Sequence, residues 1–290
     1  MSPTAPVPVS AAIVERFEGP PLSAGAIERW LADAGAAAGC RVEVVATTGS
    51  TNEDLLVRAR QQQPESSILR ATDEQTAGRG RQNRTWRARP RSALLFTLAV
   101  PLAALPAALP AITLASGVAL AEYLRGRGVL VDLKWPNDVL LDGRKLAGIL
   151  CELGIDAGGR ATLVVGVGLN GWLTEDDRAG IGQPAAALAE VVASSLLAAE
   201  REAWIAQMAA ALLQMVSGYV ERGFVPVRER YNALLSARGD EVDIIDAGRV
   251  TASGRVVEVD SIGRLVLATS SGSRAINVGD VSLRRADSQR

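Results

Sequence analysis

Apolar residues follow two different spacings along the chain. The 3.6-residue spacing of an amphipathic helix predicts helices over 23–38, 51–60 and 107–125. Ser23 is placed to cap the first helix, and Thr51 or Asn52 the second. Short apolar runs between these segments predict strands over 41–46, 66–72, 93–100, 129–134, 139–141, 144–153 and 161–169. Asp142-Gly143 separates two of these runs and is typical of a hairpin turn.

The pattern changes twice after residue 170. Residues 171–183 are polar and contain glycine, which predicts a mobile loop, and residues 184–236 predict two or three helices. From residue 238 onwards, short alternating runs separated by Gly and Asp predict a small all-β barrel. We therefore expect an α+β fold, with a mixed, mostly antiparallel sheet covered by helices. Its expected parts are a flexible lead (1–21), a larger domain (22–236) and the small barrel (237–286).

Composition limits the class of protein. The 290 residues, 48% of them hydrophobic, suffice for one sizeable core and a small second domain. A net charge of −1 argues against a nucleic-acid-binding protein, and two cysteines cannot build a disulfide framework or a Cys-rich zinc site. The uncharged stretch 92–121 is interrupted by prolines, so a buried strand followed by a helix is expected rather than a membrane span. No segment has the pattern of a signal peptide, and we expect a soluble, cytoplasmic protein.

The distribution of ionisable residues narrows the chemistry. The chain has no histidine, which excludes Ser-His-Asp and Cys-His nucleophiles, HExxH zinc sites and an imidazole base. Lysine occurs only at Lys134 and Lys145, and every other cationic side chain is an arginine. A bias towards arginine accounts for most of this trend. A compact ammonium nevertheless fits beside a reacting group where a planar guanidinium does not, so these two lysines are the leading catalytic candidates.

The stretch from Asp73 to Trp86 leads into the most distinctive loop. Six arginines and no acidic residue occur between residues 79 and 91. Gly78 and Gly80 allow the backbone to turn tightly and to approach a ligand closely. Guanidinium groups match the geometry of phosphate and carboxylate. These features indicate a local site for a polyanion, although a solvated basic loop explains the composition equally well.

Six motifs lie along the chain in a fixed order. They are Ser50-Thr-Asn52, Glu74-Gln-Thr-Ala-Gly-Arg-Gly-Arg81, Lys134-Trp-Pro-Asn-Asp138, Lys145-Leu-Ala-Gly-Ile-Leu-Cys-Glu152, Gly166-Val-Gly-Leu-Asn170 and Gly279-Asp-Val-Ser-Leu-Arg284. In this order the chain resembles the biotin–protein ligases over about residues 45–285. The resemblance implies a catalytic domain like that of class II aminoacyl-tRNA synthetases, followed by an SH3-like barrel.

The resemblance also implies a two-step reaction. The biotin carboxylate attacks the α-phosphate of ATP, with Mg²⁺ assisting, and gives biotinyl-5′-AMP and pyrophosphate. A lysine on the biotin carboxyl carrier domain of a biotin-dependent carboxylase then attacks this anhydride and releases AMP. Because the first step brings two anions together, the site must supply positive charge. Arginines, the two lysines and Mg²⁺ can do so, and no histidine is needed, since the carboxylate is ionised at pH 7.

Individual roles follow from the matching motif positions. Lys145, Arg81 and Asp138 are the implied catalytic residues. The implied biotin contacts are Ser50, Thr51, Asn52, Gln75, Gly78, Arg79, Gly80, Arg81, Lys145 and Gly148. The implied contacts of ATP and the adenylate are Arg79, Arg81, Arg84, Trp86, Lys134, Asn137, Lys145, Asn170 and Arg284. No protein ligand for a metal is fixed by the motifs: Mg²⁺ is expected to bind through the ATP phosphates, with Asn137 as the one candidate side chain.

Plainer explanations exist for most of these positions. Ser50, Thr51 and Asn52 could serve only to cap a helix, and Lys145 could be an ordinary surface residue of a hairpin. Trp86 could be a core residue, and Asn170 could simply end a strand. Asn137 and Asp138 fit a turn beside a proline. The chain departs from the family pattern at Gln82 and Asn83, where further Arg and Gly are common, and at Trp172, which we expect on the adenine side of the site.

Three other functions compete with the ligase. A bifunctional ligase that also represses transcription carries an N-terminal helix-turn-helix domain, and only 49 residues with one clear helix precede Ser50. A lipoate ligase or octanoyltransferase shares the catalytic fold, but the Gly-Arg-Gly-Arg loop and the Lys-Trp-Pro-Asn-Asp motif favour biotin. A nucleic-acid-binding module would interleave aromatic residues among the arginines. We therefore expect neither nucleic acid nor a membrane among the partners.

Overall fold

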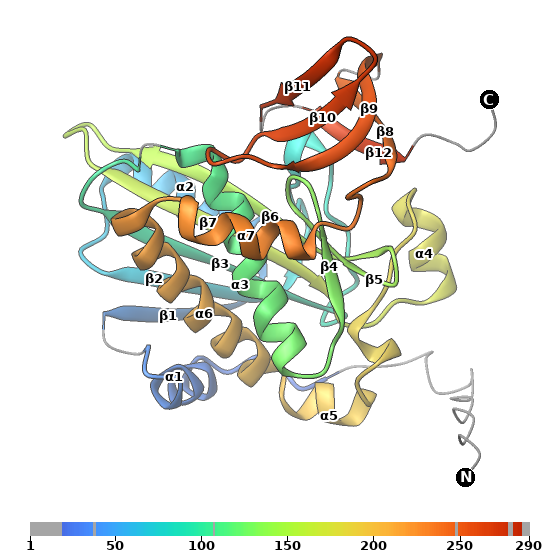
Figure 1. The fold of residues 1–290 in the computed structure, drawn as a ribbon. Coiled ribbons are helices and arrows are strands. Elements are labelled where there is room, and N and C mark those ends of the chain that lie inside the picture. Colours follow the sequence, from blue (N-terminus) through green and yellow to red (C-terminus); the bar gives the residue numbers. More distant parts are fainter. Residues whose placement is uncertain (1–18, 37–38, 107, 247–248, 278–280, 286–290) are drawn as a thin grey trace.

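A computed structural model describes residues 19–36, 39–106, 108–246, 249–277 and 281–285, and the side chains of Asn83 and of 281–285 lie outside the description. Its larger part is built on a seven-stranded sheet (Figure 1) with the order β1-β2-β3-β7-β6-β5-β4. The strands are β1 (Cys40–Thr48), β2 (Ser67–Gln75), β3 (Ala93–Leu102), β4 (Val131–Lys134), β5 (Asp138–Leu141), β6 (Arg144–Ile155) and β7 (Ala161–Asn170). Only β1 and β2 pair in parallel, so the prediction of a mixed, mostly antiparallel sheet is confirmed.

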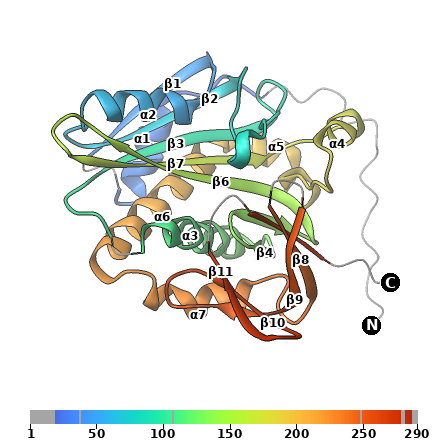
Figure 2. The same ribbon diagram turned by 90° about the horizontal axis from the view of Figure 1, so that it is seen from above.

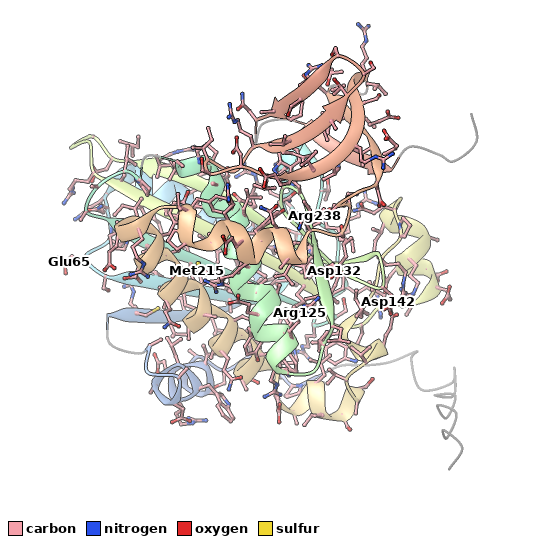
Figure 3. The ribbon with its side chains drawn as sticks, in the orientation of Figure 1. Glu65, Arg125, Asp132, Asp142, Met215 and Arg238 are labelled. Atoms are coloured by element: carbon pink, nitrogen blue, oxygen red, sulfur yellow. The ribbon has the colours of Figure 1, made fainter. Side chains whose placement is uncertain are left out.

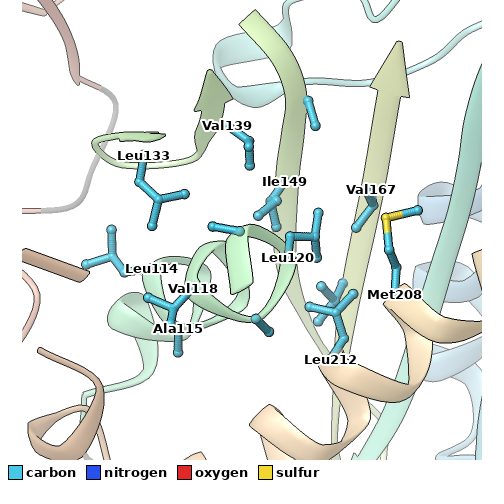
Figure 4. Close-up of a cluster of buried hydrophobic side chains, with 14 of the residues drawn as sticks. Leu114, Ala115, Val118, Leu120, Leu133, Val139, Ile149, Val167, Met208 and Leu212 are labelled. Carbon is cyan, nitrogen blue, oxygen red and sulfur yellow. The ribbon is translucent and has the colours of Figure 1, made fainter. Parts of the chain in front are cut away.

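Helices cover both faces of this sheet. They are α1 (Ala24–Asp33), α2 (Thr51–Gln61), α3 (Ile112–Gly126), α4 (Glu175–Ile181), α5 (Ser194–Ala199), α6 (Arg201–Arg222) and α7 (Val225–Leu234). In Figure 2, α2 lies on one side of the central strands, and α3 and α6 lie on the other. Helices α1, α3 and α6 pack into the main core, of which Figure 4 shows side chains from α3 and α6, whereas α2 packs with a separate apolar cluster that contains Ile68 and Val164. The neighbouring residues Leu69 and Val165 belong to the main core. Because side chains alternate across a strand, α2 must cover the opposite face of the sheet.

The predicted and observed helices differ mainly at their ends. Helix α2 is capped by Ser50, whose side chain accepts a hydrogen bond from the Glu53 backbone N–H, rather than by Thr51 or Asn52. Helix α3 starts at Ile112, five residues later than predicted, after a short 3-10 turn that contains Pro110. At the other end of α3, Arg125 pairs with Asp132 of β4 at 3.0 Å (Figure 3).

The prediction of a mobile loop over 171–183 was wrong in part. Helix α4 occupies its middle, from Glu175 to Ile181, and begins with a capping box, in which the side chains of Thr174 and Asp177 accept hydrogen bonds from each other's backbone N–H groups. Residues 184–236 contain α5, α6 and α7, in agreement with two or three helices. Of the described helices, α6 alone is long and apolar enough to cross a membrane, but half of its apolar window is buried and it packs against α1 and α3.

The C-terminal strands form a second, smaller antiparallel sheet. Its order is β11-β10-β9-β8-β12, with β8 (Glu241–Asp246), β9 (Arg249–Val259), β10 (Leu265–Thr269), β11 (Gly272–Ile276) and β12 (Val281–Arg285). No pairing joins β11 to β12 among the described residues, so closure into a barrel stays a prediction. The sheet is anchored to the larger part by polar contacts: Trp135 Nε1 donates to the Gly263 carbonyl at 3.2 Å, and Asn232 exchanges two hydrogen bonds with the Val259 backbone.

Candidate active site

A cavity of about 430 Å³ opens between the start of α2, the loop after β2, the β4–β5 turn and the strands β6 and β7. All of the site residues expected from the sequence line it, except Gly78 and Arg284. Arg284 lies on β12, where side chains are outside the described part of the chain. Five motifs that are far apart in sequence therefore meet around one cavity.

The start of α2 forms one polar wall. The backbone N–H and the hydroxyl of Thr51 both donate to Gln75 Oε1, at 2.9 and 3.0 Å. The Thr97 hydroxyl lies 2.8 Å from Thr51 Oγ1 and 3.0 Å from Asn52 Oδ1. Ser50, Thr51 and Asn52 are all buried. With the Gln75 oxygen used in this way, the Gln75 amide nitrogen is left to donate to a ligand.

The segment 76–92, called the loop arm below, folds back on itself. Trp86 N–H donates to the Gly78 carbonyl at 2.8 Å, and Gly80 N–H donates to the Arg84 carbonyl at 2.8 Å. Between them, Arg79 and Thr85 form an isolated antiparallel β-bridge. A Cβ atom on Gly78 would lie 2.5 Å from the Trp86 carbonyl oxygen, a contact that real Cβ atoms do not make. Gly78 thus permits the fold of the arm without lining the cavity.

The arginines of the loop arm are held by partners. Arg79 forms ion pairs with Glu53 of α2 and, at 3.0 Å, with Glu152 of β6. Arg81 donates to Asn137 Oδ1 at 3.3 Å, and Arg84 donates to Gln82 Oε1 at 2.8 Å. The arm is thereby ordered across the cavity, so it is not simply a solvated basic loop.

Lys145 and Asp138 form the charged centre of the cavity. Their side chains make an ion pair of 2.7 Å and both are largely buried. The Lys145 backbone is fixed by two hydrogen bonds of 2.9 Å, one to Pro184 and one from Ala186. Burial, and to a lesser degree the Asp138 carboxylate, raises the pKa of Tyr231 far above its usual range, so this phenol stays protonated.

Asn170 supports the same region from the end of β7. Its side-chain amide donates to the carbonyls of Lys145 and Ala186, at 3.3 and 3.0 Å. Asn170 is buried and also lines the cavity. Its amide nitrogen is therefore committed to holding the backbone around the lysine.

Trp86 lies against two glycines that face each other across β6 and β7. Gly148 pairs with Gly168. A Cβ atom on Gly168 would lie 2.6 Å from Trp86 Cε2, and one on Gly148 would lie 3.2 Å from Trp86 Cζ3. Lys145 Nζ is 5.7 Å from the centroid of the indole ring. Because these two glycines have no side chain, the indole ring of Trp86 can lie flat against β6 and β7, an arrangement called the seat of Trp86 below. Among the described residues, the buried Trp86 Nε1 has no hydrogen-bond partner.

Comparison with known proteins identifies the family. The models for the "Biotin/lipoate A/B protein ligase family" and the "Biotin protein ligase C terminal domain" match residues 44–170 and 239–284. The biotin--[acetyl-CoA-carboxylase] ligase of Mycobacterium tuberculosis is 33% identical over 279 residues, which cover 90% of this chain and 96% of that protein. The chain belongs to the biotin protein ligase family. Its relative in Paracoccus denitrificans, with the same name, is 31% identical over 82% of this chain and 98% of its own length.

Solved structures of the family share the fold. The biotin protein ligase of Aquifex aeolicus, in complex with biotin and ATP, superposes with a TM-score of 0.68. The alignment covers 84% of this chain and 99% of that one, at 24% identity. The α+β architecture expected from the family resemblance is therefore confirmed.

Several residues around the cavity carry no role in the sequence-based account. Thr97 bonds both Thr51 and Asn52, and Gly166 leaves room for Asn52, whose Oδ1 would lie 2.1 Å from an added Cβ. Gln183 and Ala185 line the cavity beyond α4. Trp172, expected on the adenine side, instead packs into the main core and does not line the cavity.

The described side chains do not form a metal site of their own. Among them, no group of three or more Asp, Glu or Cys residues gathers. Asn137, the candidate ligand, already accepts a hydrogen bond from the cationic Arg81 at its Oδ1. A guanidinium at this oxygen does not fit direct coordination of Mg²⁺ in the arrangement seen here.

Proposed function

We propose that this member of the family is a biotin–protein ligase, which activates biotin with ATP and transfers it to a lysine of a biotin carboxyl carrier domain. The observation that carries the proposal is the meeting of five separate motifs around one cavity, with the Lys145–Asp138 pair at its centre. The curated relatives named as biotin--[acetyl-CoA-carboxylase] ligases support the same activity.

The polar wall at α2 suits the ureido ring of biotin. This ring carries one carbonyl and two N–H groups, so it needs both donors and acceptors. The Gln75 amide nitrogen can donate, since the Gln75 oxygen is the atom that bonds Thr51, and Asn52 Oδ1 has a lone pair left to accept. Because these groups are buried and held by the protein, they are oriented before the ligand binds.

The charged centre suits the activation step. A biotin carboxylate oxygen bonds to the α-phosphorus of ATP while the bond from that phosphorus to the β-phosphate oxygen breaks, and pyrophosphate leaves. Negative charge builds up on the α-phosphate during this exchange, and the Lys145 ammonium and the Arg81 guanidinium can stabilise it. Trp86 offers a flat surface for adenine, as stacking on an aromatic ring requires.

The second step forms an amide. The acceptor amine attacks the carbonyl carbon of biotinyl-5′-AMP, the bond from that carbon to the phosphate oxygen breaks, and AMP leaves. The amine passes a proton to the Asp138 carboxylate, which is also placed to orient the amine beside Lys145. Mg²⁺ is expected to arrive with the ATP phosphates and to neutralise part of their charge. The described side chains offer no fitting ligand set for this ion.

Two further parts of the proposal concern organisation and context. The larger sheet with its helices (22–236) and the C-terminal sheet (237–286) act as a catalytic and a small accessory domain. The expected setting is the cytoplasm, with the carrier domain as macromolecular partner and neither nucleic acid nor membrane.

Pyrophosphate exchange into ATP tests the activity directly. The purified chain should incorporate labelled pyrophosphate into ATP when biotin is added, and not when lipoate or octanoate replaces it. Exchange with lipoate alone would favour the lipoate ligases, which share one of the matching family models. Salt-dependent binding to operator-like duplex DNA would revive the ligase-repressor alternative.

A further inference from the structure

Glu152 holds two residues of the cavity without lining it. It lies on β6, on the same face as Gly148 and Leu150, because side chains alternate along a strand. Its Oε2 accepts a hydrogen bond from Asn52 Nδ2 at 2.8 Å, and its Oε1 pairs with Arg79 Nη2 at 3.0 Å. One carboxylate thus contacts both the polar wall and the loop arm.

The first contact sets the direction of the Asn52 amide. An ionised carboxylate only accepts hydrogen bonds, so the Asn52 atom that faces Glu152 must be the amide nitrogen. Asn52 Oδ1 then faces the Thr97 hydroxyl and retains a lone pair for a ligand. The Leu150 carbonyl accepts a second, longer hydrogen bond of 3.4 Å from the same nitrogen. If the carboxylate were lost, only this weaker contact would hold the amide, which could then rotate and present N–H where an N–H of the ligand has to donate.

The second contact fixes the loop arm. Arg79 is the first arginine of the loop arm. Its backbone forms an antiparallel β-bridge with Thr85, which lies where the arm folds back on itself. The arm carries Arg81, whose guanidinium reaches Asn137 across the cavity. Glu53 also pairs with Arg79, but of these two described carboxylates only Glu152 accepts a hydrogen bond from the Asn52 side chain. Glu53 therefore connects Arg79 to the backbone of α2, whereas Glu152 connects Arg79 to the Asn52 side chain itself.

We propose that Glu152 is a positioning residue that couples the biotin pocket to closure of the loop arm. It orients Asn52 so that Oδ1 can accept a hydrogen bond from biotin. Its ion pair with Arg79 also holds the loop arm over the cavity, so that the adenylate stays enclosed until the carrier domain binds. This role rests on the proposed function, because it assigns Asn52 to the ureido ring.

Three variants separate the two contacts. Glu152→Gln keeps an acceptor for Asn52 but loses the charge that holds Arg79. Glu152→Ala loses both contacts. Glu53→Gln is the matched control, since it removes a carboxylate from Arg79 and leaves Asn52 untouched. For each variant we would measure the KM for biotin and for ATP by pyrophosphate exchange, the biotinylation of an added lysine-rich bystander protein, and the thermal midpoint of unfolding.

The two Glu152 variants should differ in the KM for biotin. Glu152→Ala should raise it roughly tenfold or more, the effect of one lost charge-assisted hydrogen bond, while Glu152→Gln stays within about threefold of the unaltered chain. Both variants should biotinylate the bystander several times faster, and Glu53→Gln should do so with an unchanged KM for biotin.

Three outcomes would overturn this role. They are an equal rise in the KM for biotin in Glu152→Gln and Glu152→Ala, an unchanged KM in both, and a rise in Glu152→Ala that only parallels a loss of folded protein. If the unaltered chain itself shows no biotin-dependent exchange, the proposed function fails and this role fails with it.

Discussion

The seat beneath Trp86 can be disturbed by a single methyl group. Gly168 has an ordinary strand backbone, so Gly168→Ala introduces no backbone strain. Its new Cβ would, however, lie 2.6, 2.8 and 2.9 Å from three atoms of the indole ring. Ordinary carbon–carbon contacts begin near 3.5 Å, so the ring must move by about 1 Å.

Most of this movement should appear in ATP binding rather than in stability. Stacking of a base on an aromatic ring contributes about 1–3 kcal/mol, which corresponds to roughly a 5- to 150-fold change in affinity. If the displaced indole no longer supports adenine, the KM for ATP should rise within this range. The KM for biotin should change little, because the proposed ureido pocket is at the start of α2, away from this ring.

A double-mutant cycle gives the sharpest assay. Trp86→Ala alone should raise the KM for ATP to a similar extent. Adding Gly168→Ala to this variant should raise the KM little further, because the ring that the methyl group displaces is gone. Gly126→Ala is a suitable control, since a Cβ at Gly126 meets nothing within 4 Å. Unchanged ATP kinetics in Gly168→Ala, or full additivity in the double variant, would refute the proposed seat for adenine.

Three other predictions address the charged centre and the fold. Lys145→Ala should reduce biotin-dependent exchange by about 100-fold or more while the protein remains folded, as expected for loss of one transition-state contact; near-normal exchange would remove Lys145 from this role. Arg81→Ala should let the adenylate escape, which is measured as faster biotinylation of a bystander protein; unchanged bystander labelling would argue against it. Hydrogen bonds from backbone N–H groups, that of Gln63 first, lower the pKa of Asp156 from 3.8 to about 2. Stability from this carboxylate is therefore present above about pH 4 and lost as the pH falls towards about 2. Urea unfolding of Asp156→Asn should depend less on pH in this window, and an unchanged dependence would contradict the assignment.

Much of the site was predictable because its residues are chemically unusual in this chain. With no histidine and only two lysines, attention falls on Lys134 and Lys145, and both line the cavity. Periodicity also located the central strands well, since β3 and β7 are buried on both faces and form continuous apolar runs.

Other features depend on contacts between distant segments and could not be predicted. The seat for Trp86 requires Gly148 and Gly168 to be in register, and Arg79 finds its carboxylates only once α2 and β6 lie side by side. Glu152 did leave a signal in the sequence: a charged residue directly follows the apolar strand run 149–151. A charged residue in a largely buried strand needs a partner of opposite charge or a hydrogen bond, because burying an unpaired charge is costly.

Helix α4 was missed for a local reason. Its segment is polar and has no buried residue, so it lacks the apolar stripe that reveals a helix. The Thr174–Asp177 capping box was the available signal.

A crystal structure of the chain with biotinyl-5′-AMP tests the central claim most directly. The account predicts the ureido ring against Gln75 and Asn52, the phosphate within reach of Lys145 Nζ, and adenine against Trp86. A well-ordered adenylate bound away from this cavity, or one whose phosphate lies far from Lys145, would contradict it.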